Sequence, residues 1–409
     1  MRVLVIAQYF PPDIGGSATR AHNIAKGLFL NGCDVTVIAA FPHYPHGKIP
    51  KEYHWKPFKV EWLDNMRVIR TFMPPIASKG FLRRLLLIGG FALSALFAMR
   101  LVGKFDMVWT SSWIPGIVYG KVNKKPVVIN VDDLTIEDLY DLTLLKRNSF
   151  SAKIAELVYR AFYLMGDAVT PISHGYVEII ATKYHVERDK IQVVRAGVDL
   201  QTFKLQDHSS NDKFTVLYSG AFSIAYDFEQ VLMAAKIVGA EDKGVEFIIQ
   251  GKGELEDFIK YKVIELHLKN VKVIDKLLSR TEVAKLLNQA DALILPLADF
   301  GRPYMGISSK LYEYQAVGKP IICCALGQPS DYIKETNSGI VVKPSNYEAL
   351  AETILYLKKN PIVVKNLGEC GRQYVENNMS LEKIGLRMKN ILETMNSKDS
   401  SGICIKCPP

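Results

Sequence analysis

Apolar runs of strand length alternate with amphipathic stretches at the start of the chain. Arg2–Gln8 (RVLVIAQ) is such a run, and Tyr9–Ser17 after it is rich in Pro and Gly. Ala18–Leu30 carries apolar residues at helical spacing, Asn31-Gly32 ends that helix, and Asp34–Ala40 is again strand-like. This strand–helix–strand unit predicts a parallel sheet with right-handed crossovers.

The alternation continues in two series, separated by a polar stretch, Lys204–Lys213, which we interpret as a linker. The first series goes on with the strand-like runs Asp106–Thr110, Pro126–Val131 and Ala168–Ile172. The second comprises Phe214–Tyr218, Val245–Gln250, Val271–Ile274, Ala292–Pro296, Pro320–Cys324 and Gly339–Val342. The pattern predicts an α/β fold of two Rossmann-like, doubly wound parallel-sheet domains, with a ligand crevice at the carboxyl ends of the strands.

The predicted domain organisation has four parts, because 409 residues exceed the usual size of a single core. Residues 1–203 form the first domain and residues 214–379 the second. Residues 380–396 contain the amphipathic run SLEKIGLRMKNILETM, a helix that we expect to pack back on the first domain. Residues 397–409 are expected to form a flexible tail.

Positive charge is concentrated in one segment. Residues 1–200 hold 25 Lys and Arg against 17 Asp and Glu, and residues 48–104 alone hold 11 against 3. Nucleic acid is one possible partner for such a patch, and an anionic membrane surface is another.

An apolar stretch at residues 81–103, FLRRLLLIGGFALSALFAMRLVG, lies inside that basic segment. Its unbroken core, Leu85–Met99, is too short to span a bilayer comfortably. Flanking cations at Arg83, Arg84 and Arg100 are typical of a helix lying in the membrane interface. A buried core helix explains the apolar pattern equally well, and the surrounding charge favours the membrane.

Localisation is expected to be cytoplasmic. The N-terminus, MRVLVIAQYF, lacks the long apolar region and cleavage site of a signal peptide. The six cysteines are scattered in a way that indicates reduced thiols rather than a disulfide framework.

The first motif with possible chemistry is the loop Phe10–Ser17 (FPPDIGGS), between the first strand and the first helix. Gly15 and Gly16 let backbone amides approach a ligand, and the helix N-terminus favours phosphate. Tight turns also use glycine for purely structural reasons, and the Gly-x-Gly-x-x-Gly dinucleotide fingerprint is absent.

The second motif, Gly306–Pro320 (GISSKLYEYQAVGKP), predicts a loop, a short helix that starts near Ser308 or Ser309, and a strand. Glu313 and Ser309 share one helical face, where a carboxylate can accept both hydroxyls of a ribose. Lys310 and the helix N-terminus can receive a diphosphate. An ordinary exposed pair on a surface helix remains the alternative.

Two further signals are weaker. Gly220, in the strand-end turn Tyr218–Ser223, fits either a phosphate-binding loop or a plain turn. His43 and His46 lie in a Pro-rich loop with no third ligand nearby in the sequence, so we expect surface residues and no metal site.

Taken together, these segments resemble the retaining glycosyltransferases of family 4, especially bacterial enzymes that build surface polysaccharides. The opening PPDIGGSATRAHNIAKGLFLNGCDVTVIA is similar to the first βαβ unit of that family. RAGVDLQTF, SSKLYEYQAVGKPII, GIVVKPSNYEALAETI and GECGRQYVENNMSLEKI follow its order through the second half. The resemblance implies the GT-B fold, with an acceptor-side first domain and a donor-binding second domain.

The resemblance also implies roles for individual residues. Glu313 matches the second Glu of a Glu-x7-Glu pair, which binds the donor ribose, whereas Met305 stands where the first Glu positions the sugar. Many members of that family carry an Arg and a Lys after the second-domain glycine, but the stretch after Gly220 here is AFSIAYDFE. Lys310 and Arg302 are the candidate replacements, with Ser309 and Gly220 also at the diphosphate. Gly15 and Gly16 would lie at the donor–acceptor junction, and Asp133 on the acceptor side.

The implied reaction transfers a hexosyl or N-acetylhexosaminyl residue from a nucleoside diphosphate sugar, UDP-linked by expectation, with retention. The implied acceptor is a glycan or a polyprenyl-diphosphate-linked oligosaccharide at the inner face of the cell membrane. Neither a cofactor nor a metal is expected, and nucleic acid is not an expected partner. A nucleotide-sugar 2-epimerase on the same fold and a non-catalytic nucleotide-sugar-binding partner remain alternatives.

Overall fold

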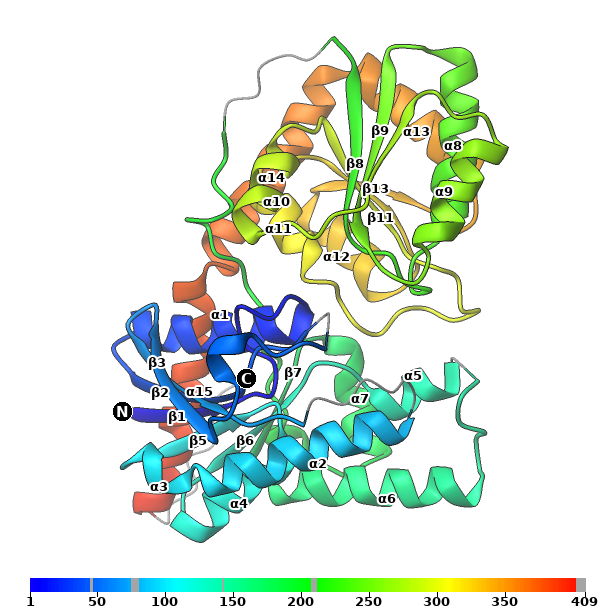
Figure 1. The fold of residues 1–409 in the computed structure, drawn as a ribbon. Coiled ribbons are helices and arrows are strands. Elements are labelled where there is room, and N and C mark those ends of the chain that lie inside the picture. Colours follow the sequence, from blue (N-terminus) through cyan, green and yellow to red (C-terminus); the bar gives the residue numbers. More distant parts are fainter. Residues whose placement is uncertain (45–46, 75–80, 142, 207–211, 402–409) are drawn as a thin grey trace. The chain divides into compact units, whose positions relative to one another are not determined.

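The computed structural model describes residues 1–44, 47–74, 81–141, 143–206 and 212–401 (Figure 1). These residues divide into two compact units, each with its own parallel sheet. The first unit comprises residues 1–197 together with the chain from Leu381 onward, and the second comprises Val198–Ser380. The first boundary therefore falls before the predicted linker, within RAGVDLQTF.

The two connections between the units lie side by side in the second unit. Val198 pairs with Ser380 in an isolated parallel bridge, and the Val198 amide donates a hydrogen bond of 2.8 Å to the Met379 carbonyl. The outgoing and returning segments are thus held together at the boundary.

The first unit has a seven-stranded sheet in the order β3-β4-β2-β1-β5-β6-β7. All neighbouring strands are parallel except β3 and β4. The strands are β1 (Arg2–Ile6), β2 (Asp34–Ala40), β3 (Phe58–Leu63), β4 (Met66–Thr71), β5 (Met107–Thr110), β6 (Val127–Val131) and β7 (Ala168–Pro171). The five strands predicted for this half are all present, so these predictions are confirmed. Each of them consists almost wholly of buried residues.

The hairpin of β3 and β4 was not predicted. Asp64 and Asn65 form its turn with φ of 49° and 62°, the left-handed conformation of a tight two-residue hairpin loop. Charged Lys59 and Glu61 interrupt the apolar character of β3, although the alternation of FKVEWL before an Asp-Asn turn is the signal that would have revealed it.

Helices cover both faces of this sheet. On one face α2, α4 and α6 form a layer, and α1 with α15 packs on the other (Figure 1). The helices are α1 (Gly16–Leu30), α2 (Phe81–Phe97), α3 (Met99–Val102), α4 (Trp113–Asn123), α5 (Thr135–Asp141), α6 (Phe150–Met165), α7 (Val177–Thr182) and α15 (Leu381–Ser401). Short 3-10 turns lie at Lys51–Tyr53, His174–Tyr176 and Arg188–Lys190.

The apolar segment 81–103 forms α2 and α3, and α2 has two different faces. Leu87 and Phe91 are buried against the sheet, whereas Leu93 and Phe97 are 59% and 67% exposed. The buried face fits the interpretation of a core helix, and the membrane interpretation stays a prediction. The side chains of Arg83 and Arg84 lie outside the described residues. Within the described ranges, no helix is long and apolar enough to cross a membrane.

The second unit has a six-stranded parallel sheet in the order β10-β9-β8-β11-β12-β13. Its strands are β8 (Phe214–Ala221), β9 (Val245–Lys252), β10 (Val271–Ile274), β11 (Ala292–Pro296), β12 (Ile321–Cys324) and β13 (Gly339–Val342). Its helices are α8 (Phe228–Glu241), α9 (Glu256–Glu265), α10 (Arg280–Asn288), α11 (Lys310–Ala316), α12 (Gln328–Thr336), α13 (Tyr347–Lys359) and α14 (Pro361–Asn378). Every strand predicted for this half is confirmed.

The C-terminal helix α15 packs on α1 in the first unit (Figure 1). Glycine allows the two backbones to touch: a Cβ at Gly385 would lie 2.0 Å from the Gly27 carbonyl oxygen. The prediction of a flexible tail from residue 397 is wrong for residues 397–401, which are helical. Residues 402–409 lie outside the described part of the chain.

We expect Gly385→Leu to lower the free energy of unfolding by about 1–3 kcal/mol, because the side chain would force α15 away from α1. Gly89→Ala is the matched control, since no described atom lies within 4 Å of a Cβ built there and alanine favours a helix. Thermal and urea unfolding of both variants would test this, and equal stability of the two would contradict the close packing.

Candidate functional site

The loop after β1 presents open backbone at Gly16. Gly15 precedes the first residue of α1, and no side chain caps the helix amides there. No described atom lies within 4 Å of a Cβ built on Gly16, so this stretch of backbone is accessible to a ligand. The structure thus places Gly15 and Gly16 at a helix start, as predicted, and their role stays a prediction.

Asp13 links this loop to the segment that follows β2. Its carboxylate accepts hydrogen bonds from the amides of His43 (2.8 Å) and Tyr44 (2.9 Å), which follow β2. Burial raises the pKa of Asp13, and the two amides partly oppose that rise. The His43 ring stacks on Tyr9 with 5.3 Å between centroids. The prediction of a surface His43 is therefore wrong, because Asp13 draws its loop into the unit, and His46 lies outside the described residues.

Arg70 on β4 braces the same loop. It is 1% exposed, and its Nε donates a hydrogen bond of 2.7 Å to Glu61. Its other nitrogens donate to the carbonyls of Phe10, Pro11 and Ala40. Arg70, one of the cations of the basic segment, is therefore buried and cannot contact a partner at the surface.

A buried network holds the end of β6, just before Asp133. The Arg20 Nε donates to Asn130 Oδ1 at 2.8 Å and lies 2.9 Å from Asp132 Oδ1. The Asn130 amide donates to the same Asp132 oxygen at 2.8 Å, and Arg20 also donates to the Val194 carbonyl. This network was not predicted, because Arg20 lies 110 residues before Asn130 in the sequence.

Asp133 follows that network at the carboxyl edge of the sheet. Its side chain reaches solvent, yet it lies close enough to the protein for loss of hydration, together with repulsion from Asp132, to raise its pKa to about 6. A carboxyl group with a pKa near neutrality is suited to accept or share a proton.

In the second unit, Glu313 on α11 forms an ion pair that the sequence did not reveal. Its Oε1 lies 3.0 Å from Arg280, the first residue of α10. The Arg280 guanidinium also lies over the Phe203 ring, 4.9 Å from its centroid. Only 15% of the Glu313 side chain is exposed, which excludes the simple surface pair that was the alternative. Its carboxylate is held in one orientation.

Lys310, at the start of α11, lies directly against Gly220. A Cβ on Gly220 would fall 2.1 Å from Lys310 Cε, so only glycine leaves room for this lysine. The Lys310 ammonium donates a hydrogen bond of 2.9 Å to the Tyr226 hydroxyl. Burial alone would raise the pKa of Tyr226, but the neighbouring ammonium outweighs burial and lowers it. The structure therefore brings together Gly220, Lys310 and a tyrosine that the sequence analysis missed.

Two further glycines extend this close-packed turn. A Cβ on Gly251, in β9, would lie 1.7 Å from the Gly220 carbonyl oxygen, and one on Gly253 would lie 2.3 Å from the Phe222 carbonyl oxygen. The Gly-x-Gly pair that ends β9 is the sequence signal that would have indicated them.

The remaining predicted residues lie in or next to the loop between β11 and α11. Ser309 is the N-cap of α11, and its side chain makes no capping hydrogen bond there. Arg302 and Met305 are both half-buried in that loop. Within the described ranges, no group of three or more His, Cys, Asp and Glu side chains is arranged to hold a metal ion.

Known protein families match both halves of the chain. The model of the family described as "Glycosyltransferase Family 4" matches residues 14–202, and that of "Glycosyl transferases group 1" matches residues 201–374. The two matches meet close to the boundary between the units. The chain carries the two domains of a GT-B glycosyltransferase.

Relatives of this glycosyltransferase align over much of its length. A putative colanic acid biosynthesis glycosyl transferase of Escherichia coli is 24% identical, over 94% of this chain and 98% of the relative. A capsular polysaccharide biosynthesis glycosyltransferase of Staphylococcus aureus is 22% identical, over 57% and 63%. HepE of Anabaena, solved with UDP and glucose, superposes with a TM-score of 0.68 at 14% identity, over 96% of this chain and all of HepE. The last likeness confirms the predicted fold.

We expect Asp133→Asn to stabilise the glycosyltransferase above about pH 6 and to have no effect on stability below about pH 4. A carboxyl whose pKa rises from 3.8 to about 6 on folding binds more protons in the folded state. Wild-type stability therefore falls as the pH rises through that window, whereas an amide does not titrate. Because Asp133 is exposed, the gain is at most about 1 kcal/mol.

Melting temperatures measured across the pH range would check this expectation. A constant difference between Asp133→Asn and wild type would show that Asp133 does not titrate in this window.

Proposed function

We propose that this glycosyltransferase transfers a hexosyl or N-acetylhexosaminyl residue from a UDP-sugar, with retention, to a glycan or polyprenyl-diphosphate-linked acceptor in polysaccharide biosynthesis. One observation carries the proposal: a carboxylate and an ammonium lie on the same turn of α11. The carboxylate of Glu313 is oriented by Arg280, and the ammonium of Lys310 is oriented by Tyr226. Relatives named for colanic acid and capsular polysaccharide biosynthesis, and the UDP bound by HepE, support the substrate class.

The Glu313 carboxylate is suited to bind the ribose. A carboxylate accepts several hydrogen bonds, so one oxygen can keep the ion pair with Arg280 while the group also accepts from sugar hydroxyls. Since Arg280 is stacked on Phe203, the carboxylate does not have to be ordered when the donor binds. Met305, where relatives have a Glu, leaves the transferred sugar to be identified by other contacts.

The diphosphate would lie where Gly220 and Lys310 meet. Tyr226 holds the Lys310 ammonium at 2.9 Å, so the cation is in place before charge develops on the leaving diphosphate. The stretch AFSIAYDFE lacks the Arg and Lys of relatives but supplies this tyrosine. Arg302 and Ser309, next to α11, complete the proposed diphosphate contacts.

In the proposed reaction, the bond between the anomeric carbon and the diphosphate oxygen breaks while the acceptor hydroxyl oxygen bonds to the same face. The proton of the acceptor hydroxyl passes to the departing phosphate. Lys310 and backbone amides at Gly220 stabilise the leaving group, and we propose that no resident metal or cofactor takes part. Asp133 would orient the acceptor hydroxyl from the carboxyl edge of the first unit.

We propose that the first unit lies on the cytoplasmic face of the membrane. Helices α2 and α6, which belong to the layer on one face of the sheet (Figure 1), expose several large apolar side chains. They include Leu86 (48%), Ile88 (49%), Leu93 (59%) and Phe97 (67%) on α2, and Ile154 (47%) and Leu157 (65%) on α6. Such a surface next to a basic segment is suited to an anionic bilayer.

We expect Glu313→Ala to weaken UDP binding by about ten- to a hundredfold, the effect of losing charge-assisted hydrogen bonds to the ribose. Calorimetry with UDP would measure it. Glu352→Ala, at an exposed position on α13, is the control and should bind UDP like the wild type. Unchanged affinity in Glu313→Ala would refute the placement of the donor.

We expect Lys310→Ala to weaken UDP binding by roughly tenfold or more while leaving uridine binding almost unchanged, because the ammonium acts on the diphosphate. Lys334→Ala, exposed on α12, is the matched control. Equal losses for UDP and uridine would place Lys310 elsewhere in the donor site. A panel of UDP-, GDP- and dTDP-sugars would then identify the donor, and binding without transfer or hydrolysis would favour the non-catalytic alternative.

A further inference from the structure

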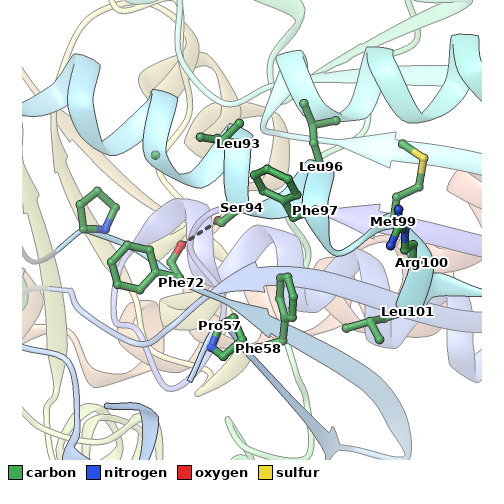
Figure 2. A pocket seen from close by; sticks show the side chains of 12 residues that line it. Pro57, Phe58, Phe72, Leu93, Ser94, Leu96, Phe97, Met99, Arg100 and Leu101 are labelled. Carbon is green, nitrogen blue, oxygen red and sulfur yellow. Dashed lines mark hydrogen bonds between the residues drawn. The ribbon is translucent and has the colours of Figure 1, made fainter. Parts of the chain in front are cut away.

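An apolar groove lies between α2 and the β3–β4 hairpin of the first unit (Figure 2). Its volume is about 1030 Å³, and its lining includes Phe58, Phe72, Pro74, Leu93, Phe97 and Leu101. None of the residues proposed above to bind the donor or to orient the acceptor hydroxyl lines this groove.

The apolar surface continues beyond the groove along edge strand β3. Alternate residues of a strand share a face, so Val60 and Trp62 lie on the same face as Phe58. They are 45% and 71% exposed. The opposite face of β3 carries Glu61, whose carboxylate pairs with Arg70 and accepts a hydrogen bond from Tyr53. The strand thus keeps its polar side chains internal and turns its apolar ones outward.

Polar groups in the groove are few and largely satisfied. The Ser94 hydroxyl donates a hydrogen bond of 2.7 Å to the Phe72 carbonyl, drawn as the dashed line in Figure 2. Among the described residues, Arg100 is the single charged residue of the lining. An apolar cavity with satisfied polar groups offers water no partners and favours an apolar occupant.

Charge around the groove indicates what the occupant carries. Residues 81–105, which contain α2 and α3, include no acidic residue, and both Arg100 and Lys104 are exposed. The groove therefore combines an apolar lining with a cationic rim, which complements a hydrocarbon chain with an anionic head.

The groove also reaches the carboxyl edge of the sheet. Phe72 and Pro74 follow β4, just as Gly15 follows β1. β4 is two places from β1 in the sheet, which separates the two strand ends by roughly 10 Å. This end of the groove therefore lies close to the loop that bears Gly15 and Gly16, whereas Arg100 lines its other end (Figure 2).

We propose that this groove is a binding site for the hydrocarbon chain of a lipid phosphate, the chemical class to which a polyprenyl-diphosphate-linked acceptor belongs. The proposal rests on the proposed membrane-associated transferase and assigns a single lipid molecule to a defined place on it. The chain lies against Leu93 and Phe97 on one side and Phe58 and Phe72 on the other, with Arg100 at the rim.

The test uses the full chain and dodecyl phosphate below its micelle-forming concentration, with binding measured by calorimetry. Phe97→Glu and Leu93→Glu alter exposed side chains of the lining, so both should fold. Each is expected to weaken dodecyl phosphate binding by about tenfold or more, because the chain would then displace water from a carboxylate. Ile362→Glu, at a 75% exposed site on α14, should bind like the wild type. Inorganic phosphate alone should not bind to the wild type with comparable affinity.

Three results would overturn the proposal. Dodecyl phosphate could bind equally to the wild type and both groove variants. Phosphatidylglycerol vesicles could bind while monomeric dodecyl phosphate does not, which would make this face a bilayer-docking surface only. Concentration-dependent dimers abolished by Phe97→Glu would show that a second copy of the chain covers the groove. UDP calorimetry on the same variants separates these results from failure of the proposed donor site, since the groove variants should keep the wild-type UDP affinity.

Discussion

The carboxyl ends of parallel strands meet at one edge of a sheet, and this constraint places every candidate residue of the protein. In the first unit it gathers the loop after β1, the His43 loop after β2 and Asp133 after β6. In the second unit it brings Gly220, at the end of β8, close to α11, which precedes β12. Residues far apart in sequence become neighbours because the strands that carry them run in the same direction.

Glu313 and Lys310, the two proposed donor-binding side chains, are each oriented by a neighbouring side chain. The ion pair between the mostly buried Glu313 and Arg280, whose side chain is 39% exposed, contributes about 1 kcal/mol or less to stability. Its main consequence is therefore the position of the Glu313 carboxylate. Lys310 is also oriented by a partner, but this partner is neutral. The Tyr226 hydroxyl accepts a hydrogen bond from the ammonium without cancelling its charge.

Sequence reasoning worked where burial is uniform and failed where it is not. The central strands were predictable because runs such as Val127–Val131 are apolar throughout. The hairpin of β3 and β4 was missed because Lys59 and Glu61 find internal partners that only the folded chain supplies. The site showed the same division: Glu313 follows from a local motif, whereas Arg280 is 33 residues away from it in the sequence and becomes its neighbour only through the fold.

The two-faced helix α2 shows which force would dominate at a membrane. Burying a large apolar side chain contributes about 1.5–3 kcal/mol, and the half-exposed side chains Leu86, Leu93 and Phe97, which share one face of α2, would each supply roughly half of that. Each cation near an anionic surface contributes only about 1 kcal/mol, so Arg100 and Lys104 together supply less than the apolar face. Charge would therefore select the membrane and orient the first unit on it, while the apolar face of α2 would hold it there.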